Sequence, residues 1–165
     1  RKGIIEYLNI IEKVIKLNQK LIFILAGRDD MDGKVQKRVK EKKLEKFIQI
    51  PGFVHNSNEI LAKADVVVLP SLLPEGCPTS ILEAMSFGKP VIGYNINGLN
   101  ELVINNETGF LVPLNDQETM ASCILKLLSS SELIEKFGRN SYNRVIKKFT
   151  LNKMLNKHRN FIKNI

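Results

Sequence analysis

Two carboxylates, Glu75 and Glu83, lie eight residues apart in a stretch that has a glycine, a proline and two hydroxyls between them. This stretch, residues 74–83, follows the apolar run 66–70 and leads into a predicted helix. The first N–H groups of a helix have no intrahelical acceptor, and the helix dipole adds positive charge there. The composition therefore predicts a strand-to-loop-to-helix turn that receives a polar or anionic ligand such as phosphate.

Each residue type in this stretch has a chemical use. Pro78 suits the first helical position, so the amides of residues 79–81 would point outward without acceptors. Gly76 would let the backbone approach a ligand closely. Glu83 could accept two hydrogen bonds from a vicinal diol such as a ribose, and Glu75 could face the open cleft and bind sugar hydroxyls. Spacing alone leaves the alternative that both carboxylates are simply solvated.

The elements that must position these residues alternate between strand and helix. We expect the run 21–27 to be a fully buried strand. We expect Ser57 to cap the helix over 56–64 and Ser131 to cap the helix over 131–147. The alternation predicts an α/β fold with a doubly wound, Rossmann-like parallel sheet and helices on both faces. Apolar spacing predicts helices over 4–17, 33–44, 56–64, 78–87, 98–104, 117–128, 131–147 and 150–162, and strands over 21–27, 47–50, 65–69, 90–94 and 109–112.

Composition sets broad limits. The 165 residues suit one domain, and the net charge of +8 indicates a Lys-rich solvated surface. Because the lysines are not interleaved with aromatics, we expect no nucleic-acid partner. Two cysteines, Cys77 and Cys123, make no disulfide framework, so we expect a reducing, cytoplasmic setting. The chain begins with Arg1 and is expected to be a fragment.

A family resemblance adds to these observations. Residues 75–78, 82–85 and 88–92 resemble E-G-x-P-x-x-x-L-E-A-M followed by G-x-P-V-I, the signature of retaining GT-B glycosyltransferases of family 4, also called group 1. Residues 52–54 are similar to the family's loop after its third strand, and residues 98–102 and 108–113 are similar to its later segments. Arg1-Lys2-Gly3 resembles the end of a G-R-x-x-x-x-K-G segment. The resemblance covers the whole chain as the family's C-terminal, donor-binding half.

The resemblance implies a nucleotide-diphospho-sugar donor, a UDP- or GDP-sugar, bound without a metal or a cofactor. Lys2 would contact the diphosphate, and the amides of Thr79 and Ser80 would add to that contact. Glu83 would hold the ribose hydroxyls. Val54 would lie beside the base through its main chain.

The resemblance also implies a reaction. Glu75, with the backbone of Gly76 and Cys77, would hold the sugar as an orienting group. The sugar would pass to a glycan or lipid-linked acceptor with retention at the anomeric carbon, in surface polysaccharide or glycolipid synthesis. Lys2 and the helix N-terminus would stabilise the leaving diphosphate.

The resemblance further implies missing parts. The donor domain would comprise residues 1–149, and a helix over 150–165 would cross back to an absent N-terminal, acceptor-binding domain. The family's first strand and the arginine of its G-R pair would lie upstream. In the sheet order 3-2-1-4-5-6 that first strand is central, so we expect a gap in the sheet. The fragment alone would be inactive, and the parent could contact a membrane peripherally.

Other functions stay open at this point. One is a non-catalytic nucleotide-sugar-binding module, and another is a GT-B-like sugar-nucleotide epimerase. The pair Asp30 and Asp32 is interpreted as part of a loop and helix cap instead of a metal site. His55, just beyond Val54, could touch a ligand, but a plain loop histidine is the simpler interpretation.

Overall fold

The computed structural model describes residues 2–163 and confirms the alternation of strands and helices. Its elements agree with the predicted ones in kind and order, and their ends shift by a few residues. The helices are α1 (Ile4–Leu17), α2 (Lys34–Glu41), α3 (Asn58–Lys63), α4 (Thr79–Ser86), α5 (Leu99–Leu102), α6 (Gln117–Leu128), α7 (Ser131–Lys148) and α8 (Leu151–Lys163). The strands are β1 (Phe23–Ala26), β2 (Ile48–Gly52), β3 (Val67–Leu69), β4 (Val91–Tyr94) and β5 (Gly109–Val112).

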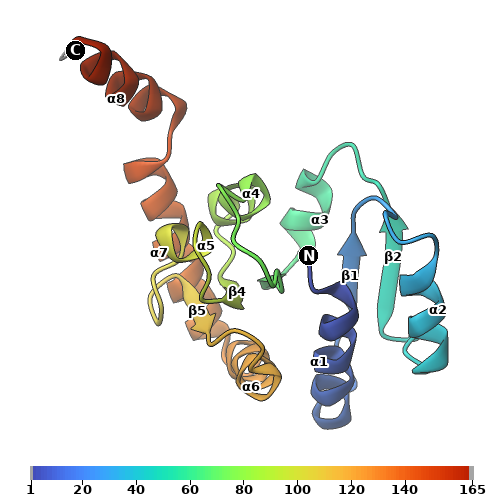
Figure 1. The fold of residues 1–165 in the computed structure, drawn as a ribbon. Coiled ribbons are helices and arrows are strands. Elements are labelled where there is room, and N and C mark those ends of the chain that lie inside the picture. The colour runs from blue at the N-terminus through green and yellow to red at the C-terminus, as the bar shows by residue number, and fades with distance from the viewer. Residues whose placement is uncertain (1, 164–165) are drawn as a thin grey trace.

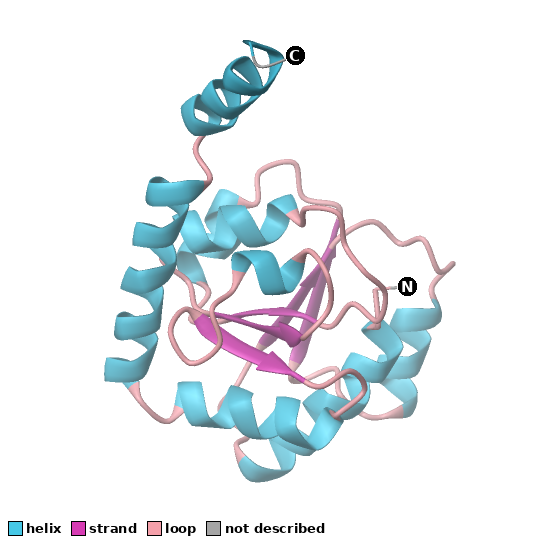
Figure 2. Ribbon diagram, turned by 60° about the vertical axis from the view of Figure 1, so that its left-hand side comes forward, coloured by secondary structure: helices cyan, strands magenta, loops and turns pink. Residues whose placement is uncertain are grey.

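The strands form two parallel sheets, and helices surround them (Figures 1 and 2). One sheet pairs β1 with β2, and the other has the order β3-β4-β5. This arrangement is the one expected for the order 3-2-1-4-5-6 when its central first strand is missing. Within residues 2–163, no strand joins β1 to β3.

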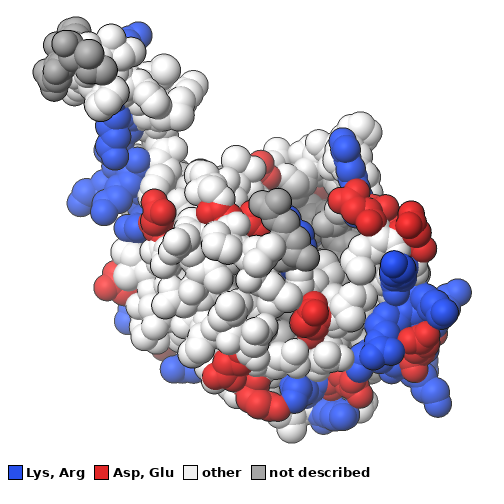
Figure 3. Space-filling model, viewed as in Figure 1, with Lys and Arg blue, Asp and Glu red and all other residues white. Residues whose placement is uncertain are grey.

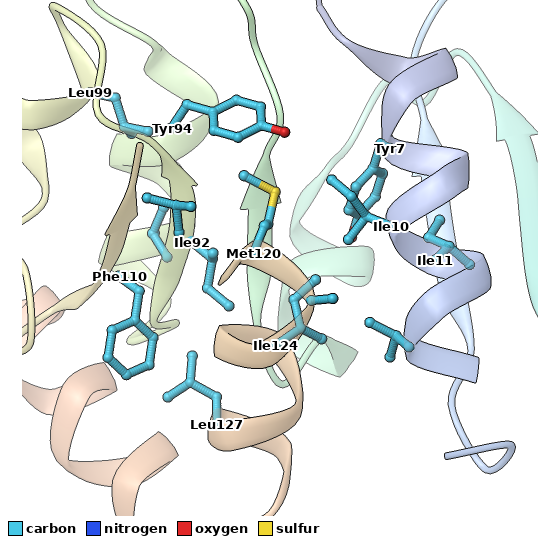
Figure 4. Packing of buried hydrophobic residues seen from close by; sticks show 14 of the residues in the cluster. Tyr7, Ile10, Ile11, Ile92, Tyr94, Leu99, Phe110, Met120, Ile124 and Leu127 are labelled. Atoms are coloured by element: carbon cyan, nitrogen blue, oxygen red, sulfur yellow. The ribbon is translucent and has the colours of Figure 1, made fainter. Parts of the chain in front are cut away.

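Helices α1 and α6 hold the two parts of the molecule together. Figure 4 shows α6 side chains Met120 and Ile124 between the strand residue Ile92 and the α1 residue Ile10. All four side chains are buried and belong to one apolar cluster. Burying a side chain of this size stabilises a fold by roughly 1.5–3 kcal/mol, so this cluster can bridge the gap between the sheets.

The prediction that the strand over 21–27 is fully buried was wrong. Phe23 of β1 packs edge-on against Tyr7 of α1, with ring centroids 6.2 Å apart. Ile22 and Ile24 alternate to the other face and remain 55% and 37% exposed. The run 21–27 is therefore not fully buried, because only the face of β1 toward α1 is covered.

The C-terminal helix stands apart from the rest of the chain. In Figures 1 and 2, α8 projects beyond the end of α7 and lies away from both sheets. Its apolar side chains Leu151, Phe161 and Ile162 are 65%, 68% and 69% exposed. None of the helices described between residues 2 and 163 is long and apolar enough to cross a bilayer.

Candidate functional site

The start of α4 differs by one residue from the prediction. Pro78 is the N-cap, with φ −70° and ψ 95°, and the helix begins at Thr79. The N–H of Ile81 donates to the carbonyl of Pro78 at 2.9 Å, so this amide is not open as expected. The amides of Thr79 and Ser80 have no acceptor among residues 2–163. The predicted anion-binding position at this helix end therefore consists of two amides instead of three.

Glu75 and Lys2, far apart in sequence, meet at this site. The Nζ of Lys2 lies 2.6 Å from Oε1 of Glu75. The same oxygen accepts a hydrogen bond of 2.7 Å from the hydroxyl of Ser71. The Glu75 side chain is 10% exposed, whereas that of Lys2 is 58% exposed. The fold thus joins the residue predicted to contact a diphosphate and the residue predicted to orient a sugar.

The loop that carries Glu75 is fixed by the turn before α5. The Glu75 N–H donates to the carbonyl of Asn97 at 3.0 Å. Gly98 has φ 88°, and a Cβ there would lie only 1.9 Å from the Glu75 carbonyl oxygen. Loops after β3 and β4 therefore meet at one sheet edge, as expected for the carboxyl ends of parallel strands.

Gly76 and Cys77 are exposed beside this contact. A Cβ at Gly76 would meet no atom within 4 Å. The surrounding chain therefore gives no steric reason for a glycine, and the space is compatible with close approach of a ligand to the backbone. Cys77 is a free, exposed thiol.

Glu83 lies on the exposed side of α4 and contacts α3. Its Oε2 accepts a hydrogen bond of 3.0 Å from the Ser57 hydroxyl. Ser57 was predicted to cap its helix, and it does occupy the N-cap position of α3, but its side chain makes no cap bond. The prediction was wrong about the hydroxyl, because Ser57 has helical dihedrals, φ −69° and ψ −15°, instead of the extended ones that aim an N-cap side chain at the helix N–H groups.

The loop after β2 adds an aromatic group. Val54 is half-buried there, and His55 is exposed. The rings of Phe53 and His55 meet edge to face at 4.9 Å between centroids. The guanidinium of Arg28, just after β1, lies 5.0 Å from the Phe53 centroid. His55 is thus an exposed loop histidine in contact with Phe53.

Sequence reasoning missed Ser71, and it missed the acceptor of Ser57. Ser71 has a local signal, since it is a hydroxyl directly after Pro70 at the carboxyl end of β3. The hydrogen bond from Ser57 to Glu83 has no local sequence signal, because Glu83 lies 26 residues away on another helix.

Two further observations concern metal ligands and Cys123. Within residues 2–163, no three His, Cys, Asp or Glu side chains are grouped so that they could hold a metal ion. The acidic pair Asp30 and Asp32 lies in a loop that Asp29 organises by accepting from the N–H groups of Met31 and Gly33. Cys123 is half-buried against the core, and its burial raises the pKa of the thiol.

The fold is an α/β fold with parallel sheets flanked by helices. The family described as glycosyl transferases group 1 matches residues 1–144, and the chain belongs to that family. The chain is 33% identical over 141 residues to an Escherichia coli UDP-Gal:α-D-GlcNAc-diphosphoundecaprenol α-1,3-galactosyltransferase. The matched region covers 82% of this chain and 35% of that relative. The chain spans about a third of the length of the curated relatives it matches.

Solved structures give the same result. A Staphylococcus aureus TarM mutant, crystallised with UDP among its ligands, superposes with a TM-score of 0.90 at 27% identity over 96% of this chain and 32% of that one. The C-terminal domain of LpcC, a group 1 glycosyl transferase from Francisella tularensis, gives a TM-score of 0.77 at 29% identity. The match covers 91% of this chain and 80% of that domain. The predicted GT-B resemblance is thereby confirmed.

Proposed function

We propose that this chain is the donor-binding domain of a retaining glycosyltransferase that uses a nucleotide-diphospho-sugar. The observation that carries the proposal is the contact of Lys2 with Glu75 beside the two open amides of α4. A cation, two amides and a carboxylate in one place can bind a phosphate and a sugar hydroxyl together.

The proposed binding mode divides the donor among these groups. The diphosphate lies against Lys2 and the amides of Thr79 and Ser80, where positive charge and free N–H groups combine. The ribose hydroxyls donate to Glu83, which Ser57 already holds by one oxygen. The base lies along the main chain of the loop after β2, near Val54.

The sugar end of the donor is proposed to lie at Glu75. Its carboxylate accepts hydrogen bonds from sugar hydroxyls, and the exposed backbone of Gly76 and Cys77 approaches the ring. The anomeric carbon then faces the acceptor, and its bond to the leaving diphosphate breaks. Negative charge that builds on the diphosphate is stabilised by Lys2 and by the start of α4, so this proposal needs no metal.

The acceptor is proposed to bind on a second, N-terminal domain, so residues 1–165 alone would not transfer a sugar. We assign the donor domain to residues 1–149, and α8 packs its exposed apolar side chains against that second domain. The supporting observation is the exposure of Leu151, Phe161 and Ile162.

We also propose that basic side chains near α8 allow the parent protein to contact anionic membrane lipids. Residues 136–165 hold nine Lys and Arg residues and no Asp or Glu. Figure 3 shows basic side chains gathered where α7 leads into α8. Charge of this kind attracts acidic head groups over about a Debye length.

A thermal-shift panel tests the proposed donor class. Residues 1–165 are heated alone and with UDP, GDP, ADP and their sugar conjugates at millimolar concentration. A ligand that binds only the folded state raises the Tm, by about 2.7 kcal/mol of stability at a hundred times its Kd. We expect UDP or GDP and its sugar conjugates to raise the Tm. Equal Tm values with every nucleotide and without any would contradict the proposal.

A non-catalytic binding module or an epimerase would pass the same panel. A protein that joins this domain to its acceptor domain separates these functions, because only a transferase consumes the donor and adds the sugar to an acceptor. An epimerase would instead change the sugar while it stays attached to the nucleotide.

A further inference from the structure

Ser71 is a buried hydroxyl whose proton is directed at a carboxylate. The residue is 0% exposed and lies two positions after the end of β3. Its Oγ donates to Oε1 of Glu75 at 2.7 Å, an ordinary distance for a hydroxyl donor. A buried serine needs a partner, but a backbone carbonyl would serve; here the partner is the site carboxylate.

Two different donors share this one oxygen. The ammonium of Lys2 is at the end of a flexible four-carbon chain and is 58% exposed, so it can turn to another anion. Ser71 cannot follow such a movement, because it is enclosed by the protein. When a diphosphate attracts Lys2, Ser71 keeps its position on Glu75.

The backbone of Glu75 is already fixed by other contacts. Its N–H is bonded to the carbonyl of Asn97, and its own carbonyl lies against Gly98. What remains to be set is the rotation of the side chain, which has three torsions. A hydrogen bond at one carboxylate oxygen removes most of that freedom and presents the group in one orientation.

We propose that Ser71 is a positioning residue for Glu75. It holds Oε1 so that the carboxylate keeps its orientation toward the sugar of the donor while Lys2 engages the diphosphate. Ser71 does not itself touch the donor, and its effect is confined to the sugar. The inference rests on the proposed function, since it requires a nucleotide-sugar in this site.

The test compares a nucleotide with its sugar conjugates in residues 1–165. Isothermal titration measures Kd for UDP, UDP-galactose, UDP-glucose and UDP-N-acetylglucosamine in the wild type and in Ser71→Ala. We expect the variant to bind UDP within about twofold of wild type, because UDP has no sugar for Glu75 to hold. Its Kd for the sugar conjugate that the wild type binds best should rise about tenfold, as for a lost hydrogen bond to a charged group.

Two further variants separate positioning from general stability. Ser141 is also 0% exposed, and its hydroxyl donates to the carbonyl of Thr108 at 3.0 Å. Ser141→Ala therefore removes a matched buried hydrogen bond, and it should lower the Tm without changing the ratio of the two Kd values. Ser71→Cys keeps the shape of the side chain with a larger atom and only a weak donor, so it is a second test of the inference if Ser71→Ala does not fold.

The outcomes are distinguishable. Failure of the wild type to bind any nucleotide would defeat the proposed function, and this inference with it. Equal weakening of UDP and the sugar conjugate in both Ser71 variants would overturn the inference alone. A wild type that binds UDP and all three conjugates equally would also overturn it, because Glu75 would then contribute nothing that needs positioning.

Discussion

Replacing Gly98 by alanine should displace the loop that carries Glu75. The added Cβ would lie 1.9 Å from the Glu75 carbonyl oxygen, and real Cβ atoms are not found closer than 3.0 Å to such an atom. The contact lies between two backbone segments, so no flexible side chain can yield. The loop must therefore move by about 1 Å or more, which is comparable to the tolerance of a well-positioned binding site.

The cost of Gly98→Ala has two parts. The backbone of Gly98, with φ 88° and ψ −49°, is strained for any residue with a Cβ, by roughly 1–3 kcal/mol. For a chain of this size that strain lowers the Tm by about 2–12 °C. Displacement of Glu75 adds a functional cost. Misaligned hydrogen bonds from sugar hydroxyls to a carboxylate should weaken a UDP-sugar about ten- to a hundredfold.

The assay needs a control for backbone strain alone. Gly33 also has a positive φ, 76°, but a Cβ there would meet nothing within 4 Å. Gly33→Ala should therefore lower the Tm through strain without affecting the site. Titration of UDP-galactose into both variants compares the two effects. If Gly98→Ala binds UDP-galactose as well as Gly33→Ala does, the argument that Gly98 positions Glu75 is refuted.

Further substitutions test the fold around the site. Ser130, and not Ser131 as predicted, caps α7 by accepting from the N–H of Leu133, so Ser130→Ala should cost about 1 kcal/mol in thermal unfolding, and an unchanged Tm would contradict the cap. A Cβ on Gly138 would lie 2.1 Å from the Gly88 carbonyl oxygen, so Gly138→Ala should separate α4 from α7 and cost about 1–3 kcal/mol. Hydrogen bonds from Thr119 hold the pKa of Asp116 below its usual range. That stabilisation is present above pH about 4 and is lost as pH falls through the lowered pKa, so Asp116→Asn, which can still cap α6, should flatten the acid limb of the stability curve.

Local sequence signals predicted the elements that follow simple periodicity. The bounds of α1, α6 and β5 agree with those read from apolar spacing and from the flanking turn residues. The start of α4 was missed by one residue, since a proline can serve both as N-cap and as first helical residue. Burial of the run 21–27 was overestimated, because apolar content alone does not show how many faces of a strand are covered.

The site was predicted only in part, for a different physical reason. The type and spacing of Glu75 and Glu83 predicted a polar or anionic ligand, which stays a prediction, and the family resemblance indicated Lys2. The contacts that orient the carboxylates come from Ser71 and Ser57. Ser57 reaches Glu83 across the space between two helices, and no periodic pattern in a single sequence encodes such a distance.

The proposed donor site depends most directly on Glu83. The decisive measurement is the Kd of UDP for wild type and Glu83→Ala by isothermal titration, with Glu135→Ala as a control that removes an exposed helical glutamate from α7. Loss of the ribose hydrogen bonds to a carboxylate should raise the Kd about tenfold or more in Glu83→Ala and leave the control unchanged. Binding of UDP by Glu83→Ala as tightly as by wild type would contradict the assignment of this site.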